Sequence, residues 1–61
     1  MNAKEGDKFS DPNTKKVYVV TDLFFDGLYA ILREVNGNGD VLMSLEELKT
    51  WERQPPSDEK G

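Results

Sequence analysis

Three apolar runs separated by turn residues dominate the pattern of this chain. Residues 16–25 are rich in β-branched and aromatic side chains, which favours a strand. Asp26 and Gly27 are typical of a tight two-residue hairpin turn, so residues 28–35 are expected to return antiparallel. The Gly- and Asn-rich segment 36–39 then precedes a short third run, 41–43. The pattern predicts an antiparallel β-meander.

Flanking signals extend this meander at both ends. Asp11 and Pro12 begin a turn signal that is expected to join a short strand around Phe9 to the next strand. After the third run, Ser44 is a suitable N-cap and Glu47 completes a capping box. Apolar residues then recur at helical spacing at Leu45, Leu48 and Trp51. The sequence predicts a helix that closes the sheet and stops at Pro55 and Pro56.

The expected fold class is mainly β, a small α+β domain. It comprises an antiparallel meander of three to five strands and a short C-terminal helix. Residues 28–35 leave one alternative open, because their Leu, Ala, Arg and Glu residues also favour helix. We expect a flexible arm at residues 1–7, one domain at 8–54 and a disordered tail at 55–61.

This layout resembles the small SH3-like barrels that occur as stand-alone bacterial and phage proteins. The resemblance covers residues 8–53 and rests on the turn positions and on the segment Val-Leu-Met-Ser-Leu-Glu-Glu-Leu at 41–48. It implies an SH3-like barrel or a curled sheet, and leaves open whether the sheet closes. The acidic loop and proline-binding aromatics of peptide-binding SH3 domains do not form a recognisable string here, so the resemblance implies no partner.

Composition narrows the classes of function. At 61 residues and 36% hydrophobic content, the chain supports one thin core and no deep substrate cavity. It has no cysteine, which excludes disulfides and thiolate zinc sites. Twelve acidic and eight basic residues give a net charge of −4, which opposes binding to nucleic acid and anionic membranes. Without an apolar leader or a stretch of about 20 apolar residues, a cytoplasmic location is expected.

Catalytic candidates are few. The chain has no histidine, which is the commonest general base, and its serines have no evident base beside them. The carboxylates of Asp26 and Glu47 are explained by a turn and a helix cap. We therefore expect a protein that is not an enzyme and needs no cofactor.

A calcium loop is the alternative for residues 34–46. The order of oxygen ligands and glycine resembles an EF-hand loop that begins at Glu34. The candidate ligands are Glu34, Asn36, Asn38, Asp40 and Glu46. However, position 12 of the loop is Leu45, and the first downstream carboxylate arrives one residue late. Calcium binding would also require residues 28–35 to be a helix. A Gly/Asn-rich hairpin loop explains the same residues.

Aromatic residues give the leading site. Strict alternation places Tyr18, Phe24 and Tyr29 together on one face, where they would form an exposed apolar patch. Asp22 and Arg33 lie at its rim. Such a patch suits a protein partner or a second copy of the chain.

The sequence thus predicts a small protein–protein interaction module whose partner it does not identify. The size of the chain is typical of accessory or inhibitor proteins of phages and mobile elements. The calcium-binding structural module is one alternative. A nucleic-acid-binding small barrel that uses Lys8, Lys15 and Lys16 is another, and it would require steeply salt-dependent binding.

Overall fold

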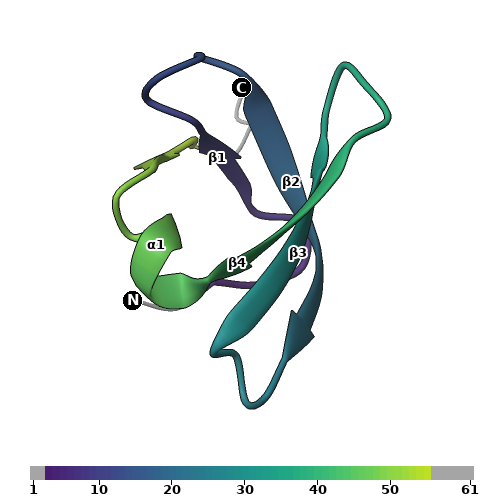
Figure 1. The fold of residues 1–61 in the computed structure, drawn as a ribbon, viewed down its shortest axis with the longest axis vertical. Coiled ribbons are helices and arrows are strands. Elements are labelled where there is room, and N and C mark those ends of the chain that lie inside the picture. The colour runs from purple at the N-terminus through teal and green to yellow at the C-terminus, as the bar shows by residue number, and fades with distance from the viewer. Residues whose placement is uncertain (1–2, 56–61) are drawn as a thin grey trace.

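Five antiparallel strands form one curled sheet, and a single helical turn lies between the last two strands (Figure 1). The computed structural model describes residues 3–55. Its elements, in chain order, are β1 (Lys8–Ser10), β2 (Val17–Phe24), β3 (Tyr29–Glu34), β4 (Asp40–Ser44), α1 (Leu45–Leu48) and β5 (Glu52–Arg53). The order of strands across the sheet is β4-β3-β2-β1-β5. The predicted mainly β meander is confirmed, and β3 is a strand rather than a helix.

The turn between β1 and β2 forms where Asp11 was expected to start it. The Asp11 side chain accepts a hydrogen bond from the backbone N–H of Asn13 at 2.8 Å, and the Asp11 carbonyl accepts one from the N–H of Lys15 at 2.7 Å. Lys15, the last residue of this turn, adopts a left-handed conformation with a φ of 67°. The side chain of Asp11 therefore stabilises the reversal that brings β2 alongside β1.

The hairpin between β2 and β3 is wider than predicted. Phe24 and Tyr29 are the last pair of the ladder, so the loop has four residues, 25–28, rather than two. Phe25, Asp26 and Gly27 have φ values of 53°, 57° and 82°. The loop thus reverses the chain with consecutive left-handed residues, of which glycine alone adopts this region without steric cost.

A β-bulge in β2 changes which side chains face the core. Val20 pairs with Leu32, but the next pair joins Asp22 to Ile31, so Thr21 is an extra residue. The Thr21 hydroxyl donates a hydrogen bond to the Ile31 carbonyl at 3.2 Å. Side chains after the bulge therefore point to the opposite face from the one that strict alternation predicts.

The capping box at α1 is present in part, and the helix is shorter than expected. Ser44 is the N-cap, and its hydroxyl accepts a hydrogen bond from the backbone N–H of Glu47 at 3.2 Å. The helix ends at Leu48, well before Pro55. The chain then forms β5, which pairs with β1. The prediction of a helix that continues to the prolines was wrong, because the backbone from Glu52 onward pairs with the edge of β1 instead.

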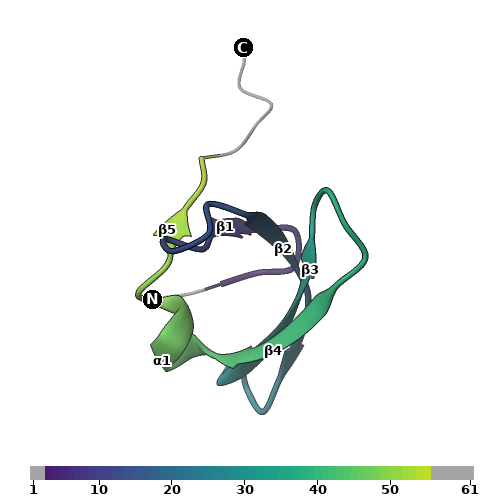
Figure 2. The same ribbon diagram turned by 45° about the horizontal axis from the view of Figure 1, so that its top comes forward.

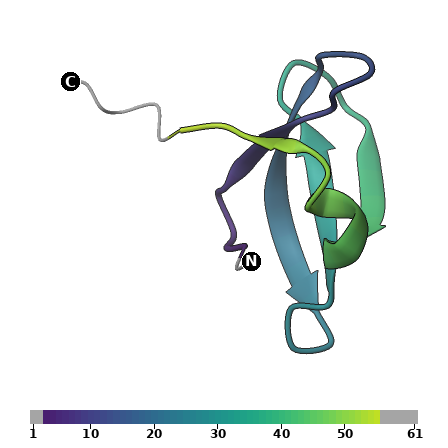
Figure 3. The ribbon, with the colours of Figure 1, turned by 90° about the vertical axis from the view of Figure 1, so that its left-hand side faces the viewer.

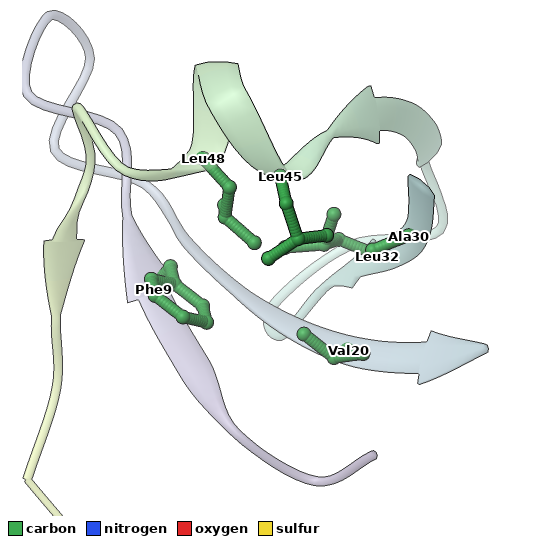
Figure 4. Close-up of a cluster of buried hydrophobic side chains, with 6 residues drawn as sticks. All are labelled: Phe9, Val20, Ala30, Leu32, Leu45 and Leu48. Carbon is green, nitrogen blue, oxygen red and sulfur yellow. The ribbon is translucent and has the colours of Figure 1, made fainter. Parts of the chain in front are cut away.

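Six buried side chains make up the core, between the concave face of the sheet and α1 (Figure 4). They are Phe9, Val20, Ala30, Leu32, Leu45 and Leu48. The two leucines of α1 point toward the side chains of the sheet. Figure 2 shows α1 and β5 continuing the curl of the sheet beyond β4. The helical turn thus covers a core that an open sheet of this size would expose.

Residues 3–7, which the sequence assigns to a flexible arm, contact the sheet. The backbone N–H of Gly6 donates to the Val20 carbonyl, and the N–H of Val20 donates to the Asp7 carbonyl, both at 2.8 Å. Asp7 also forms an ion pair with Arg53 at 2.6 Å. Residues 1–2 of the predicted arm and 56–61 of the predicted tail lie outside the described residues.

Candidate functional site

The face of the sheet opposite the core carries an apolar patch at the β2–β3 hairpin end. Phe24 pairs with Tyr29, while Ile31 lies between Asp22 on β2 and Leu42 on β4. A shallow hollow of about 270 Å³ lies on this face. Its lining residues, which we call the outer patch, are Phe24, Phe25, Tyr29, Ile31 and Leu42. No polar surface lines this hollow, which suits an apolar group of a binding partner.

Large side chains of the outer patch remain open to solvent. Phe25 is 73% exposed, Leu42 66%, Tyr29 42% and Phe24 41%. The rings of Phe25 and Tyr29 meet edge to face, with centroids 5.9 Å apart and an interplanar angle of 80°. This contact holds Phe25 over the hollow although the residue lies in a loop.

Charged residues border the outer patch. Arg33 and Asp40 form an ion pair, with 3.1 Å between Nε and Oδ1, in the row next to Ile31 and Leu42. Asp22 pairs with Ile31 across β2 and β3, whereas Asp26, in the hairpin loop, lines a different hollow beside α1. Within residues 3–55, Asp22 has no ion-pair partner. The patch is therefore apolar at its centre and polar at its rim, as protein-binding surfaces commonly are.

The structure brings together four of the five predicted site residues. Phe24, Tyr29, Asp22 and Arg33 share the outer face. Tyr18 does not, because it precedes the bulge at Thr21 and faces the core side. There it pairs with buried Phe9, and its ring lies 5.3 Å from that of Trp51.

Three residues of the outer patch are not among the predicted site residues. Ile31 is two residues from Tyr29 on the same strand, so alternation alone places it on the same face. Leu42 is opposite Ile31, a register that becomes visible once the β3–β4 turn is known. Phe25 belongs to the hairpin loop, and no local pattern indicates where a loop side chain points.

The proposed calcium loop has a different environment. Glu34 belongs to strand β3, so the entering helix that the EF-hand alternative requires is replaced by a strand. Glu34 is 3.9 Å from the Lys16 ammonium group, and Asp40 is paired with Arg33. Within residues 3–55, no three His, Cys, Asp or Glu side chains gather where they could hold a metal ion.

A second, larger hollow of about 590 Å³ lies between the N-terminal segment, the β2–β3 loop and α1. Apolar Leu28 and Leu45 line it together with charged residues, among them Glu46 and Lys49. Those two side chains are 3.7 Å apart and neutralise each other. Its mixed walls offer neither the apolar surface of the outer patch nor a nucleophile beside a base.

Comparison of the chain with protein-family models, with curated proteins and with solved structures finds no match. Across residues 3–55, no helix has the length and apolar character needed to cross a membrane.

Proposed function

We propose that this chain is a small protein-interaction module that binds a partner protein through the outer patch. The observation that carries the proposal is the clustering of exposed Phe24, Phe25, Tyr29 and Leu42 around an apolar hollow. Together these side chains expose on the order of 400 Å² of apolar surface, since one aromatic side chain presents about 150–250 Å². That area falls in the range of the largest patches of soluble monomers, which are often functional.

Backbone strain at Phe25 supports the same function. A non-glycine residue in the left-handed region costs about 1–2 kcal/mol, and Phe25 has a φ of 53°. Its side chain gains little burial in return, since 73% of it is exposed. Residues held in strained backbone conformations cluster at active sites and ligand-binding segments.

The size of the outer patch determines how a partner must bind. A standard interface buries about 800 Å² on each side, roughly twice the area of the patch. The partner must therefore also cover the rim, where Asp22 lacks an ion-pair partner within the described residues. A basic side chain at the edge of the partner surface would complement this carboxylate.

We also propose that the fold is of the SH3-like type and that the chain is not an enzyme. The SH3-like assignment is supported by the meander of four strands, followed by one helical turn and a short last strand that pairs with the first. The absence of histidine from the chain supports a non-enzymatic role. Accessory or inhibitor activity in a phage or mobile element remains part of the same proposal and is supported by the size of the chain alone.

A capture experiment with matched variants tests the proposal. Tyr29 and Val35 are each 42% exposed, but only Tyr29 lines the outer patch. Tagged wild-type protein, Tyr29→Ser and Val35→Ser would be used to capture partners from lysate of the source cell. The proposal requires a protein retained by the wild type and by Val35→Ser but lost with Tyr29→Ser. A partner bound equally by all three folded proteins would show that the outer patch is not its binding surface.

A further inference from the structure

The two edge strands of the sheet, β4 and β5, differ in length and in the features that prevent pairing with another strand. β5 has two residues and is followed by Gln54 and Pro55. β4 has five residues, Asp40–Ser44, without lysine, proline or bulge. Natural edge strands commonly carry such features to prevent pairing with other chains. Figure 3 shows β4 at the edge of the sheet, on the side away from β1 and β5.

The hydrogen bonds between β3 and β4 determine which backbone groups of β4 point toward its free edge. The N–H of Glu34 donates to the Gly39 carbonyl, and the N–H of Leu45 donates to the Leu28 carbonyl, both at 2.9 Å. Hydrogen-bonded and non-hydrogen-bonded pairs alternate along an antiparallel ladder. The register between these two bonds therefore places Leu42, opposite Ile31, in a non-hydrogen-bonded pair. The N–H and C=O of Leu42 point away from β3, as do those of Asp40.

We propose that a second copy of this chain pairs with the free edge, β4 antiparallel to β4, about a twofold axis at Leu42. This inference goes beyond the proposed binding through the outer patch, because the second copy pairs with the backbone edge of β4. Leu42 of each copy exchanges both backbone hydrogen bonds with Leu42 of the other. The N–H of Ser44 in each copy donates to the Asp40 carbonyl of the other copy. One ten-stranded sheet results, with the outer patches of both copies on the same face.

The side chains of β4 favour a second copy in this register. Leu42, which is 66% exposed, lies opposite its own equivalent and continues the apolar row that begins at Ile31. Asp40 lies opposite Ser44 rather than opposite another Asp40, so no like charges face each other. Each Asp40 is also paired with Arg33 of its own copy at 3.1 Å, which reduces repulsion between the two acidic chains.

Five paired residues per copy bury a small area, so the dimer is weak and its population rises with concentration. Interfaces below about 1,200 Å² are typical of transient complexes. Burial of Leu42 also joins the two apolar hollows, because this residue lines each of them. The dimer thus exposes one larger apolar surface than either copy alone.

Single cysteines test the register, because the chain has none of its own. Equivalent Cα atoms at the twofold axis lie about 5.5 Å apart, so cysteines there are within reach of a short bifunctional thiol cross-linker. With such a reagent, Leu42→Cys is expected to form a covalent dimer. Asp40→Cys is the matched control on the same strand, since its equivalents are offset by four residues and lie roughly 14 Å apart at about 3.4 Å per residue. Val35→Cys is the control for exposure. Equal cross-linking of all three, or none for Leu42→Cys, overturns the proposal.

Sedimentation equilibrium separates this inference from the proposed function. Leu42→Lys places two ammonium groups at the axis and is expected to weaken self-association by roughly tenfold or more. Tyr29→Ser should leave self-association near the wild-type value, since Tyr29 is not on β4. A wild type that stays monomeric up to millimolar concentration overturns the dimer, while capture of another protein through Tyr29 would still support the interaction function. Failure of both measurements would remove both proposals.

Discussion

At the scale of single residues, backbone conformation at the glycines gives the sharpest prediction. Gly27 has a φ of 82°, and a Cβ added there meets no atom within 4 Å. Gly39 lies outside the left-handed region, and its added Cβ meets only a Glu34 carboxylate oxygen, at 3.9 Å. Gly27→Ala is therefore expected to lower the free energy of unfolding by about 1 kcal/mol or more, whereas Gly39→Ala should be neutral or stabilising. Urea denaturation measures both, and equal effects would contradict the assigned loop conformation.

Single residues also show what the sequence does and does not predict. The turn at Asp11 and the cap at Ser44 follow from local side-chain hydrogen bonds, so both could be predicted. The extra residue Thr21 could not, because no glycine or proline marks the bulge and its hydrogen bond is to β3, ten residues away. That residue is why Phe24 was predicted on the same face as Tyr18, although the two side chains lie on opposite faces.

At the scale of secondary structure elements, helix α1 depends on its N-cap. It has four residues, too few to be stable alone, and it holds Leu45 and Leu48 in the core. Ser44→Ala removes the acceptor for the Glu47 N–H and should cost about 1 kcal/mol. For a domain of this size the cost lowers Tm by about 4–8 °C, measurable by circular dichroism. Ser44→Asp should restore most of the loss, and an unchanged Tm in Ser44→Ala would contradict a role for the cap.

Strand β5 shows why element boundaries after Leu48 could not be predicted. The segment continues the helical spacing as far as Trp51, so a local pattern favours a longer helix. In the structure, Phe9 and Ser10 on β1 offer a free edge that pairs with Arg53 and Glu52. Tertiary hydrogen bonds therefore override the helical period, and such partners are distant in sequence.

At the scale of the whole molecule, one face of the sheet stabilises the fold and the other is the proposed binding surface. The core face carries the six buried side chains, while the outer face carries the exposed patch. The predicted meander and helix start were enough to place Leu48 toward the sheet. The composition of the outer patch depends on the bulge and on the β3–β4 register, which are properties of the assembled sheet.

Two leucine substitutions, one on each face, test how much each face contributes to the free energy of unfolding. Leu48 is fully buried, so Leu48→Ala should cost roughly 2–5 kcal/mol. A chain of this length has a total stability of roughly 3–9 kcal/mol, so this loss is a large fraction of it and the variant should unfold at a much lower urea concentration than the wild type. Leu42 is 66% exposed, so Leu42→Ala should change the free energy of unfolding by no more than about 0.5 kcal/mol. Urea denaturation of the two variants measures both changes in the free energy of unfolding. A large loss for Leu42→Ala would mean that the outer face stabilises the fold, and the case for it as a binding surface would weaken accordingly.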